Sequence, residues 1–363
     1  MFNGLAKQNC DFSYATGTLN FADGDTSKTF SVLISKDAYH QGSDAINLAL
    51  NNPTGGATMG AQSTSTLTII DDLSIPTNSQ PMDDAGTFVC QTYHDFLARQ
   101  ADSGGLDYWT SQITQCGANQ TCINNQRIAV SNAFFFELEY QQTGSYVYRL
   151  YRAAYGNNQP FPNPNPYPQD PTQPAKFPAY AVFLPDRARL VGSSNLAADQ
   201  LALANLFVQR AEFLNQYPVS LNGSDFISAV LQTIQNADVA DLSGQAGNLL
   251  TLYNSAGGVD AGRGAVLYRL ANDDGPSGPN GGINNRPFID AEYNRAFVTT
   301  QYFGYLRRDG DIGGLLFWLG QVNSAPLRDT TKQHAMVCSF ISSQEYQNRF
   351  STMVTHTNAE CPQ

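Results

Sequence analysis

The chain has 363 residues, of which 20 are Lys or Arg and 31 are Asp or Glu, so its formal net charge is −11. Because nucleic acids and anionic membranes are bound by clustered Lys and Arg, an acidic chain without a basic run argues against both partners. Hydrophobic residues make up 42% and charged residues only 14%, which excludes wholesale disorder and favours a secreted or cell-surface protein over a cytosolic enzyme.

Short strands are predicted in the N-terminal block, where apolar and polar residues alternate. They are Thr18–Phe21, Lys28–Ile34, Ala45–Leu50 and Ser65–Ile70. Regular turns between them predict a small antiparallel, immunoglobulin-like β-sandwich over residues 1–72. The opening residues Met1–Lys7 lack the order of a signal peptide, so we expect either a missing leader or a fragment. No apolar run reaches the roughly 18 residues that a membrane span needs.

Helical periodicity dominates after a polar linker at 73–82, so the fold class expected is multidomain α+β: a partial β-sandwich followed by a mainly α-helical body. The segments expected beyond the linker are helical module 1 (83–156), a Pro-rich connector (157–185), a central helical region (186–272), a Gly/Pro loop (273–287) and helical module 2 (288–363). The proline content of the connector favours a stiff arm or spacer, since proline cannot continue a helix.

The helical body contains an internal repeat of a helix, a tight turn and a second helix. The turn residues of the first copy are Asp102, Gly104, Gly105 and Trp109, and those of the second are Asp311, Gly313, Gly314 and Trp318. In each copy we expect the Asp to cap the following helix, the glycines to allow the turn and the Trp to pack beneath it. Each copy then leads to a helix that ends in Glu-Tyr-Gln, at 139–141 and 345–347.

Six cysteines permit a full set of disulfides, which implies a periplasmic or extracellular location. Cys116 and Cys122 bracket a short loop and are predicted to pair. Cys338 and Cys361 are predicted to pin the C-terminal tail, which leaves Cys10 and Cys90 as a third pair. No paired Cys/His spacing of a zinc site occurs.

Residues 13–72 resemble the Calx-β family. The strings that carry the resemblance are Tyr14–Phe21, Asp23–Phe30, Asn47–Ala57 and Leu67–Asp72. The resemblance implies an immunoglobulin-like sandwich, which is calcium-binding in some members and common in surface adhesins. Such a sandwich has about seven strands, whereas this chain offers fewer, because the family's N-terminal strands would precede Cys10.

The acidic loop of that family is weakened here, where Gln41-Gly42-Ser43-Asp44 stands at its position. Calcium prefers six to eight oxygen ligands, several of them carboxylates. The candidate ligands are Asp44, Asp71 and Asp72, and the alternative reading is that these are solvated, turn-capping acids.

Residues 86–350 look like the bacterial domain of unknown function numbered 4214. The turns Asp102–Trp109 and Asp311–Trp318 carry the match, together with Asn132–Phe136 and Gln301–Arg308. The resemblance implies a helical domain found beside surface modules, and it transfers no catalytic residue.

No catalytic motif stands out in the chain. Asp102-Ser103-Gly104-Gly105 is like the nucleophile string of chymotrypsin-like proteases, but Ile312 replaces the serine in the second copy. A tyrosine- and arginine-rich helix, Tyr146–Tyr155, is either a protein interface or an ordinary core-facing helix.

These patterns predict a non-enzymatic, secreted bacterial surface protein with a structural or assembly role. One hypothesis is a filament subunit joined by β-strand complementation of the incomplete sandwich. The alternative is a calcium-stiffened adhesin or a glycan- or matrix-binding module. The partners expected are other copies of the chain and a cell-surface glycan or protein, with no resident cofactor other than calcium.

Overall fold

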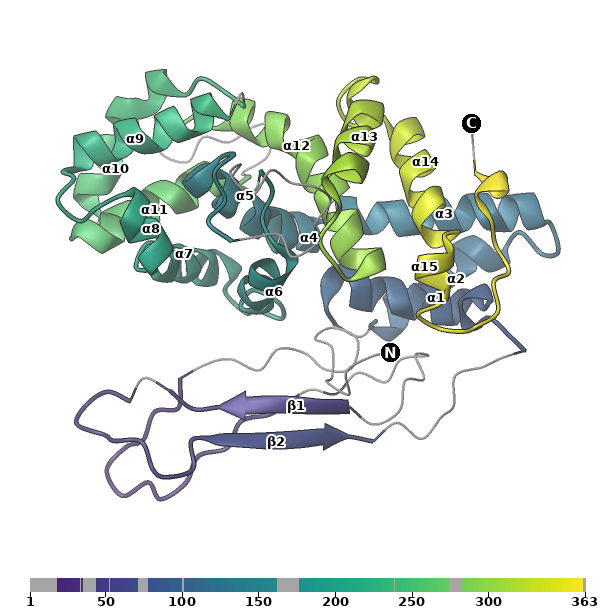
Figure 1. The fold of residues 1–363 in the computed structure, drawn as a ribbon, viewed down its shortest axis with the longest axis horizontal. Helices are drawn as coiled ribbons and strands as arrows, with labels where there is room; N and C mark the ends of the chain where they lie inside the picture. The colour runs from purple at the N-terminus through teal and green to yellow at the C-terminus, as the bar shows by residue number, and fades with distance from the viewer. Residues whose placement is uncertain are drawn as a thin grey trace. The chain divides into compact units, whose positions relative to one another are not determined.

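The computed structural model of the protein describes residues 18–32, 34, 44–51, 53–70, 78–99, 101–161, 176–237, 239–273 and 282–361. Of these residues, 60% lie in helix and 4% in strand (Figure 1). The chain forms two compact units, the first made of residues 1–127 with 341–360, and the second of 128–340 with 361–363. The mainly helical body expected after the linker is therefore confirmed.

The first unit holds both strands and the first helices. Its elements are β1 (Asp44–Ala49), β2 (Thr64–Ile69), η1 (Pro81–Asp83), α1 (Ala85–Thr92), the π-helical turn η2 (Tyr93–Leu97), α2 (Ser103–Thr114), α15 (Gln344–Gln347) and η6 (Asn358–Glu360). The boundary between the units falls within α3 (Gln120–Phe136) and again at the end of α14 (Thr330–Ile341).

The second unit contains the remaining helices. They are α4 (Leu138–Gln142), α5 (Gly144–Tyr155), α6 (Tyr180–Ala188), α7 (Leu196–Phe207), α8 (Ala211–Gln216), α9 (Gly223–Asn236), η3 (Ser243–Gln245), α10 (Ala246–Ser255), α11 (Val259–Ala271), α12 (Arg286–Gln301), the π-helical turn η5 (Tyr302–Leu306) and α13 (Ile312–Asn323). No helix among the described residues combines the length and apolar character needed to cross a membrane. Helix α6 begins inside the predicted Pro-rich connector and contains Pro185.

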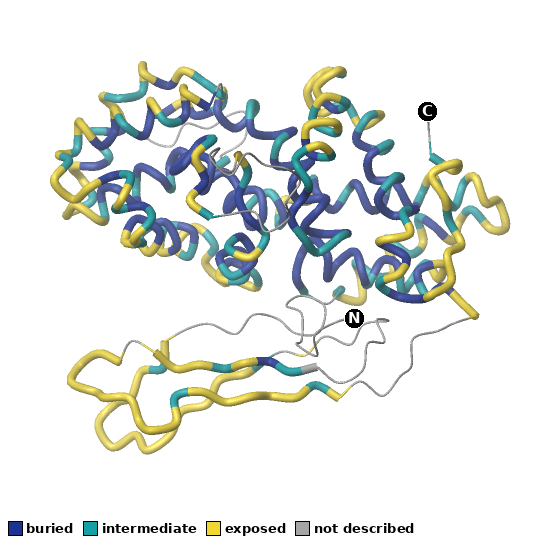
Figure 2. The backbone as a smooth tube through the Cα atoms, in the orientation of Figure 1, coloured by how far each residue is buried: buried dark blue, intermediate teal, exposed yellow. Residues whose placement is uncertain are grey.

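The predicted β-sandwich is wrong. The described residues form one antiparallel sheet of two strands, in which Asp44 pairs with Ile69 and Ala49 with Thr64. Two of the four expected strands form, whereas Thr18–Phe21 and the described part of Lys28–Ile34 do not. Alternation of apolar and polar residues is a local pattern, and it does not establish that a second sheet covers the apolar face. Figure 2 shows most of this ribbon as exposed, although Ile46 is buried.

The helical core of the first unit forms around α1. Arg127 stacks over the ring of buried Phe88, with 4.3 Å from its guanidinium carbon to the ring centroid, and donates a hydrogen bond to the Met82 carbonyl. A second arginine, Arg349, pairs with the fully buried carboxylate of Asp95 at 3.1 Å. These contacts hold together segments that are far apart in sequence.

Helix α5 lies at the centre of the second unit, and every one of its residues is buried (Figure 2). It packs against α6, α9, α11 and α12. Its Arg152 forms an ion pair of 2.9 Å with Glu292 of α12, and both side chains are shielded from solvent. Gly156 ends the helix with a φ of 55°, a backbone conformation that favours glycine.

Candidate functional site

The first copy of the repeat folds as a π-helical turn followed by a capped helix. Helix α1 continues into η2, and Ala98 then reverses the chain in a left-handed conformation with a φ of 56°. Asp102 is the N-cap of α2, and its Oδ1 accepts a 2.8 Å hydrogen bond from the Gly105 N–H. That hydrogen bond lowers the pKa of the Asp102 carboxyl. The predicted capping role of Asp102 is therefore present.

The second copy has the same local geometry. Helix α12 continues into η5, and Arg307 takes the left-handed conformation with a φ of 54°. Asp311 caps α13 and accepts a 2.7 Å hydrogen bond from the Gly314 N–H. The two segments thus share a π-helical turn, a left-handed residue and an Asp cap, each at the same place.

The second glycine of each Gly-Gly pair lies directly against a tyrosine from the π-helical turn. A Cβ atom on Gly105 would lie 2.1 Å from the Tyr93 hydroxyl oxygen, and one on Gly314 would lie 2.2 Å from that of Tyr302. The first glycines have room, since a Cβ on Gly104 or Gly313 would meet only the capping Asp, at 3.6 Å and 3.5 Å respectively. Only the second glycine of each pair is therefore required by packing.

An arginine stacks on each of these tyrosines. The guanidinium carbon of Arg99 is 5.1 Å from the ring centroid of Tyr93, and that of Arg308 is 5.6 Å from that of Tyr302. Both distances lie within the range of a cation–π contact. Tyr93 with Arg99 and Tyr302 with Arg308 stand at equivalent positions of the two copies, but their stacking on each other and against the glycine was not predicted.

The helix after each turn presents an aromatic pair at its surface. Tyr108 and Phe317 occupy equivalent positions, and each is 57% exposed. Each ring packs edge-to-face against the following tryptophan, at 4.9 Å for Trp109 and 5.1 Å for Trp318. Both tryptophans are half-buried, and Trp318 also contacts the ring of Phe340 of α14 at 6.3 Å.

The correspondence continues into the next two helices. Each turn and its second helix are followed by a long helix and a short one, α3 with α4 in the first copy and α14 with α15 in the second. The tyrosines of the two Glu-Tyr-Gln strings, Tyr140 and Tyr346, are both buried. The geometric equivalence therefore extends from the π-helical turn to these buried tyrosines.

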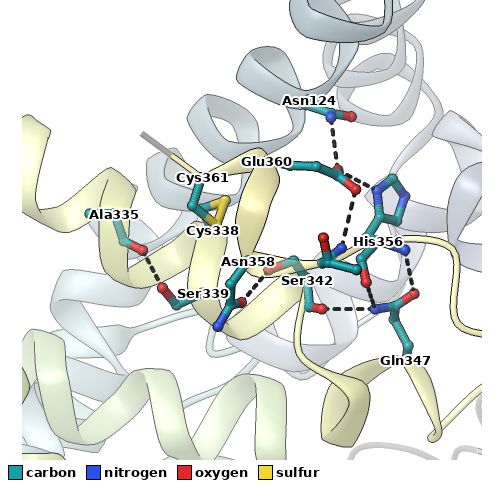
Figure 3. Close-up of a disulfide and its surroundings, with 11 residues drawn as sticks. Asn124, Ala335, Cys338, Ser339, Ser342, Gln347, His356, Asn358, Glu360 and Cys361 are labelled. Atoms are coloured by element: carbon teal, nitrogen blue, oxygen red, sulfur yellow. Dashed lines mark hydrogen bonds and ion pairs between the residues drawn. A yellow bond between two sulfur atoms is a disulfide. The ribbon is translucent and has the colours of Figure 1, made fainter. Parts of the chain in front are cut away.

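Two of the three expected disulfides form. Cys116, in the loop before α3, pairs with Cys122 in the first turn of α3, and Cys338 of α14 pairs with Cys361 near the C-terminus (Figure 3). Cys90 is a free cysteine, so the third pairing does not hold in this structure, and Cys10 lies outside the described residues. The thiol of Cys90 is half-buried on α1, and burial together with the charge of Asp84 raises its pKa.

A histidine holds the C-terminal segment of the first unit. His356 contacts Asp83 through Nε2 at 3.0 Å and Glu360 through Nδ1 at 2.8 Å, the latter visible in Figure 3. The hydrogen bond with Asp83 raises the pKa of the His356 imidazole by more than burial lowers it. Burial would raise the pKa of the Asp83 carboxyl, but hydrogen bonds from His356 and Thr355 lower it on balance.

The structure describes only one of the three proposed calcium ligands. Asp44 is the first residue of β1, whereas Asp71 and Asp72 lie outside the described residues. Within the described ranges, no group of three or more His, Cys, Asp or Glu side chains is placed to hold a metal ion. Calcium binding by this set stays a prediction.

The tyrosines of α5 belong to the core, so the interface reading of this helix is wrong. Tyr146 donates a hydrogen bond to the Gln200 carbonyl at 2.9 Å, and Tyr151 donates one to Asp186 at 2.8 Å. Burial raises the pKa of both tyrosine hydroxyls well above its usual value. Because their hydroxyls have partners inside the unit, these rings are buried at little polar cost.

Comparison with known proteins identifies one segment. Residues 285–350 match a family described as Domain of unknown function (DUF4214), and this segment spans α12, η5, α13, α14 and α15. No curated protein and no solved structure matches the chain. These comparisons lend no support to the predicted Calx-β domain or to a second copy of the family domain.

Proposed function

We propose that this chain is a non-enzymatic structural protein of the bacterial surface that assembles with other copies by β-strand addition to the β1–β2 ribbon. The observation that supports the proposal is that the ribbon has only two strands among the described residues. A two-stranded sheet alone is marginally stable in water and needs further strands or a packed layer. In the described residues, β1 and β2 pair only with each other.

The ribbon and its flanks expose large apolar side chains. The exposed fraction is 58% for Phe21 and 80% for Ile70, and Phe30 and Leu50 are also exposed. Large exposed apolar surface marks an interaction site, so we propose that a partner covers these side chains. An added strand supplies backbone hydrogen bonds to a free edge and brings side chains to cover these residues.

A location outside the cytoplasm is supported by the two disulfides. Disulfides persist in oxidising compartments and are rare where cellular thiols keep cysteines reduced. The two disulfides therefore fit a protein that works outside the cytoplasm, as an assembling surface protein does.

The helical body of such a protein is proposed to contain two copies of one module. Support comes from the shared π-helical turn, Asp cap and tyrosine–glycine contact of the two segments. Only the second copy lies within the segment that matches the family. The first copy would then be a divergent member, in which helix geometry persists while the surface residues differ.

Analytical ultracentrifugation of the full chain over a range of concentrations tests the assembly role. We expect concentration-dependent self-association, with slower hydrogen exchange of the β1 or β2 amides at high concentration. The double variant Leu67→Lys/Ile70→Lys should abolish both effects, since charges would replace two apolar side chains on the ribbon. Thr66→Lys, at an exposed polar position of the same strand, is the matched control and should retain them. A wild-type chain that stays monomeric and shows no amide protection would disprove the proposal.

A further inference from the structure

The first unit includes an irregular segment, residues 351–360, here called the strap. Apart from the short helix η6, the strap has no helix or strand. Ser351 donates a hydrogen bond to the Ser79 carbonyl at 2.6 Å, and the side chain of Gln80 donates one to the Met353 carbonyl at 2.8 Å. The strap therefore lies beside the residues that lead into η1, although the two segments are far apart in sequence.

Several contacts of the strap are made by groups that do not titrate. The buried side chain of Gln347 accepts hydrogen bonds from the backbone N–H groups of Thr355 and His356, at 2.8 Å and 3.0 Å (Figure 3). Ser342 donates a hydrogen bond to the Asn358 side chain at 2.8 Å. Amide and hydroxyl groups keep the same charge on both sides of neutral pH, so these contacts hold the strap equally in acid and in base.

The His356 imidazole differs, because both of its ring nitrogens face carboxylates. Nε2 is 3.0 Å from Oδ1 of Asp83 on η1, and Nδ1 is 2.8 Å from Oε2 of Glu360 on η6. An imidazole donates from both nitrogens only when it is protonated, and in the neutral ring one nitrogen becomes an acceptor. One of the two carboxylates would then face a lone pair. Both contacts are therefore complete only for the imidazolium.

The charged groups around His356 come from three elements, η1, η6 and α3. The hydrogen bond with Asp83 raises the pKa of His356 most, and the contact with Glu360 adds to this effect. Burial and the positive charge of Arg127 on α3 lower that pKa, but the balance is a raised value. Asn124 of α3 is neutral and donates a hydrogen bond to Glu360 at 2.8 Å. The closed strap therefore binds this proton more tightly than an open strap would.

We infer that the strap is a pH-sensitive latch, which protonated His356 holds against η1 and which loosens when the imidazole loses its proton to solvent. The ring is 12% exposed, so solvent can reach it. The latch is fully closed below the pKa of a free histidine, about 6.5, and opens as the pH rises through the higher pKa of the closed state. For each unit by which closure raises that pKa, the opening equilibrium grows about tenfold across this range.

The disulfide keeps this opening local. Cys361, the residue after the strap, is bonded to Cys338 of α14, so the strap stays attached at both ends when His356 releases it. The contacts of Ser351 and Met353 with the residues before η1 contain no titratable group. The part released is therefore residues 355–360, and the latch can close again when the pH falls.

Hydrogen exchange of the full chain tests the latch, measured by mass spectrometry from about pH 5 to about pH 9 and corrected for the intrinsic effect of pH. In the wild type, protection of the amides of residues 355–360 should fall at least about threefold as the pH rises, which corresponds to half a pKa unit. His356→Gln should give low protection in acid and no fall. Asp83→Asn should move the fall to lower pH, because it removes the hydrogen bond that contributes most to the raised pKa.

His334→Gln is the matched control. His334 of α14 is also half-buried, but burial lowers its pKa, so this variant should keep the fall in protection. An NMR titration of the wild-type imidazole protons reads the pKa of His356 without any substitution. Protection that does not change with pH, a His356 pKa at or below about 6.5, or loss of the fall in His334→Gln would each overturn the latch.

The latch goes beyond the assembly role proposed above and uses no residue of the β1–β2 ribbon. Leu67→Lys/Ile70→Lys should therefore leave the pH dependence of strap protection unchanged while it abolishes self-association. If that variant removes the pH dependence, the fall in protection comes from assembly and the latch is refuted. If the wild-type chain stays monomeric and the fall persists, strand addition is refuted and the latch stands.

Discussion

Replacing Gly314 by alanine tests the packing of the repeated turn. The new methyl group would lie 2.2 Å from the Tyr302 hydroxyl oxygen and 3.1 Å from both carboxylate oxygens of Asp311. Overpacking of this kind costs about 1–3 kcal/mol, whereas alanine in a helix gains up to about 1 kcal/mol over glycine. We expect Gly314→Ala to lower the free energy of unfolding by up to about 2 kcal/mol, which is the overpacking cost less the full helix gain.

The neighbouring glycine provides the control. A Cβ on Gly313 meets only an Asp311 oxygen at 3.5 Å, so Gly313→Ala keeps the helix gain without the clash and should be neutral or stabilising. Tyr302→Phe removes the oxygen that causes the clash, and adding it to Gly314→Ala should recover most of the loss.

Urea unfolding followed by circular dichroism measures all four variants, with each transition fitted separately because the chain has two units. The decisive quantity is the coupling energy between Tyr302→Phe and Gly314→Ala. A coupling energy near zero, or equal effects of the two glycine substitutions, would refute the packing argument. The same comparison applies to Gly104, Gly105 and Tyr93 in the first copy.

Three other predictions follow from the buried and tail contacts. Arg152→Met should destabilise the protein by about 3–5 kcal/mol by leaving Glu292 unpaired, and Arg152→Met/Glu292→Met should recover most of that stability in urea unfolding. His356→Gln should cost the most stability below about pH 6.5, because the pKa of His356 is raised in the folded state. Thermal unfolding at several pH values measures this cost. The difference from wild type should fade as the pH rises through the raised pKa of His356. Cys338→Ser/Cys361→Ser opens a loop with a sequence separation of 23 and should cost about 3 kcal/mol under non-reducing conditions, a difference that a reductant should remove.

The repeated turn shows how far local sequence chemistry reaches. An Asp followed by two glycines predicts a capped helix, and both Asp102 and Asp311 act as caps. Which glycine is required depends on a tyrosine in the preceding π-helical turn. That contact is tertiary, so no propensity or spacing rule identifies it.

The missing second sheet and the buried tyrosines of α5 were not predicted for one physical reason: both depend on packing between distant segments. Alternating residues correctly located β1 and β2, but burial of a strand face depends on a second layer that no local pattern reveals. The tyrosines of α5 could be predicted either at an interface or in the core, because their rings are apolar and their hydroxyls are polar. In the folded unit, Tyr146 and Tyr151 find hydrogen-bond acceptors and become core residues. The acceptors belong to Gln200 and Asp186 on other helices, and the local sequence of α5 does not show which distant residues will lie beside its tyrosines.

The two copies of the turn separate what folding requires from what is free to vary. Ala98 and Arg307 both adopt the left-handed conformation, which costs a residue other than glycine about 1–2 kcal/mol. Both turns therefore keep a strained backbone, and the tyrosine–glycine contact and the Asp cap are the shared features that stabilise it. The exposed side of the following helix carries no such constraint, and there Asp107 is replaced by Leu316. An exposed leucine does not contribute to the turn, so this side of α2 and of α13 can differ while the cap and the tyrosine–glycine contact are kept.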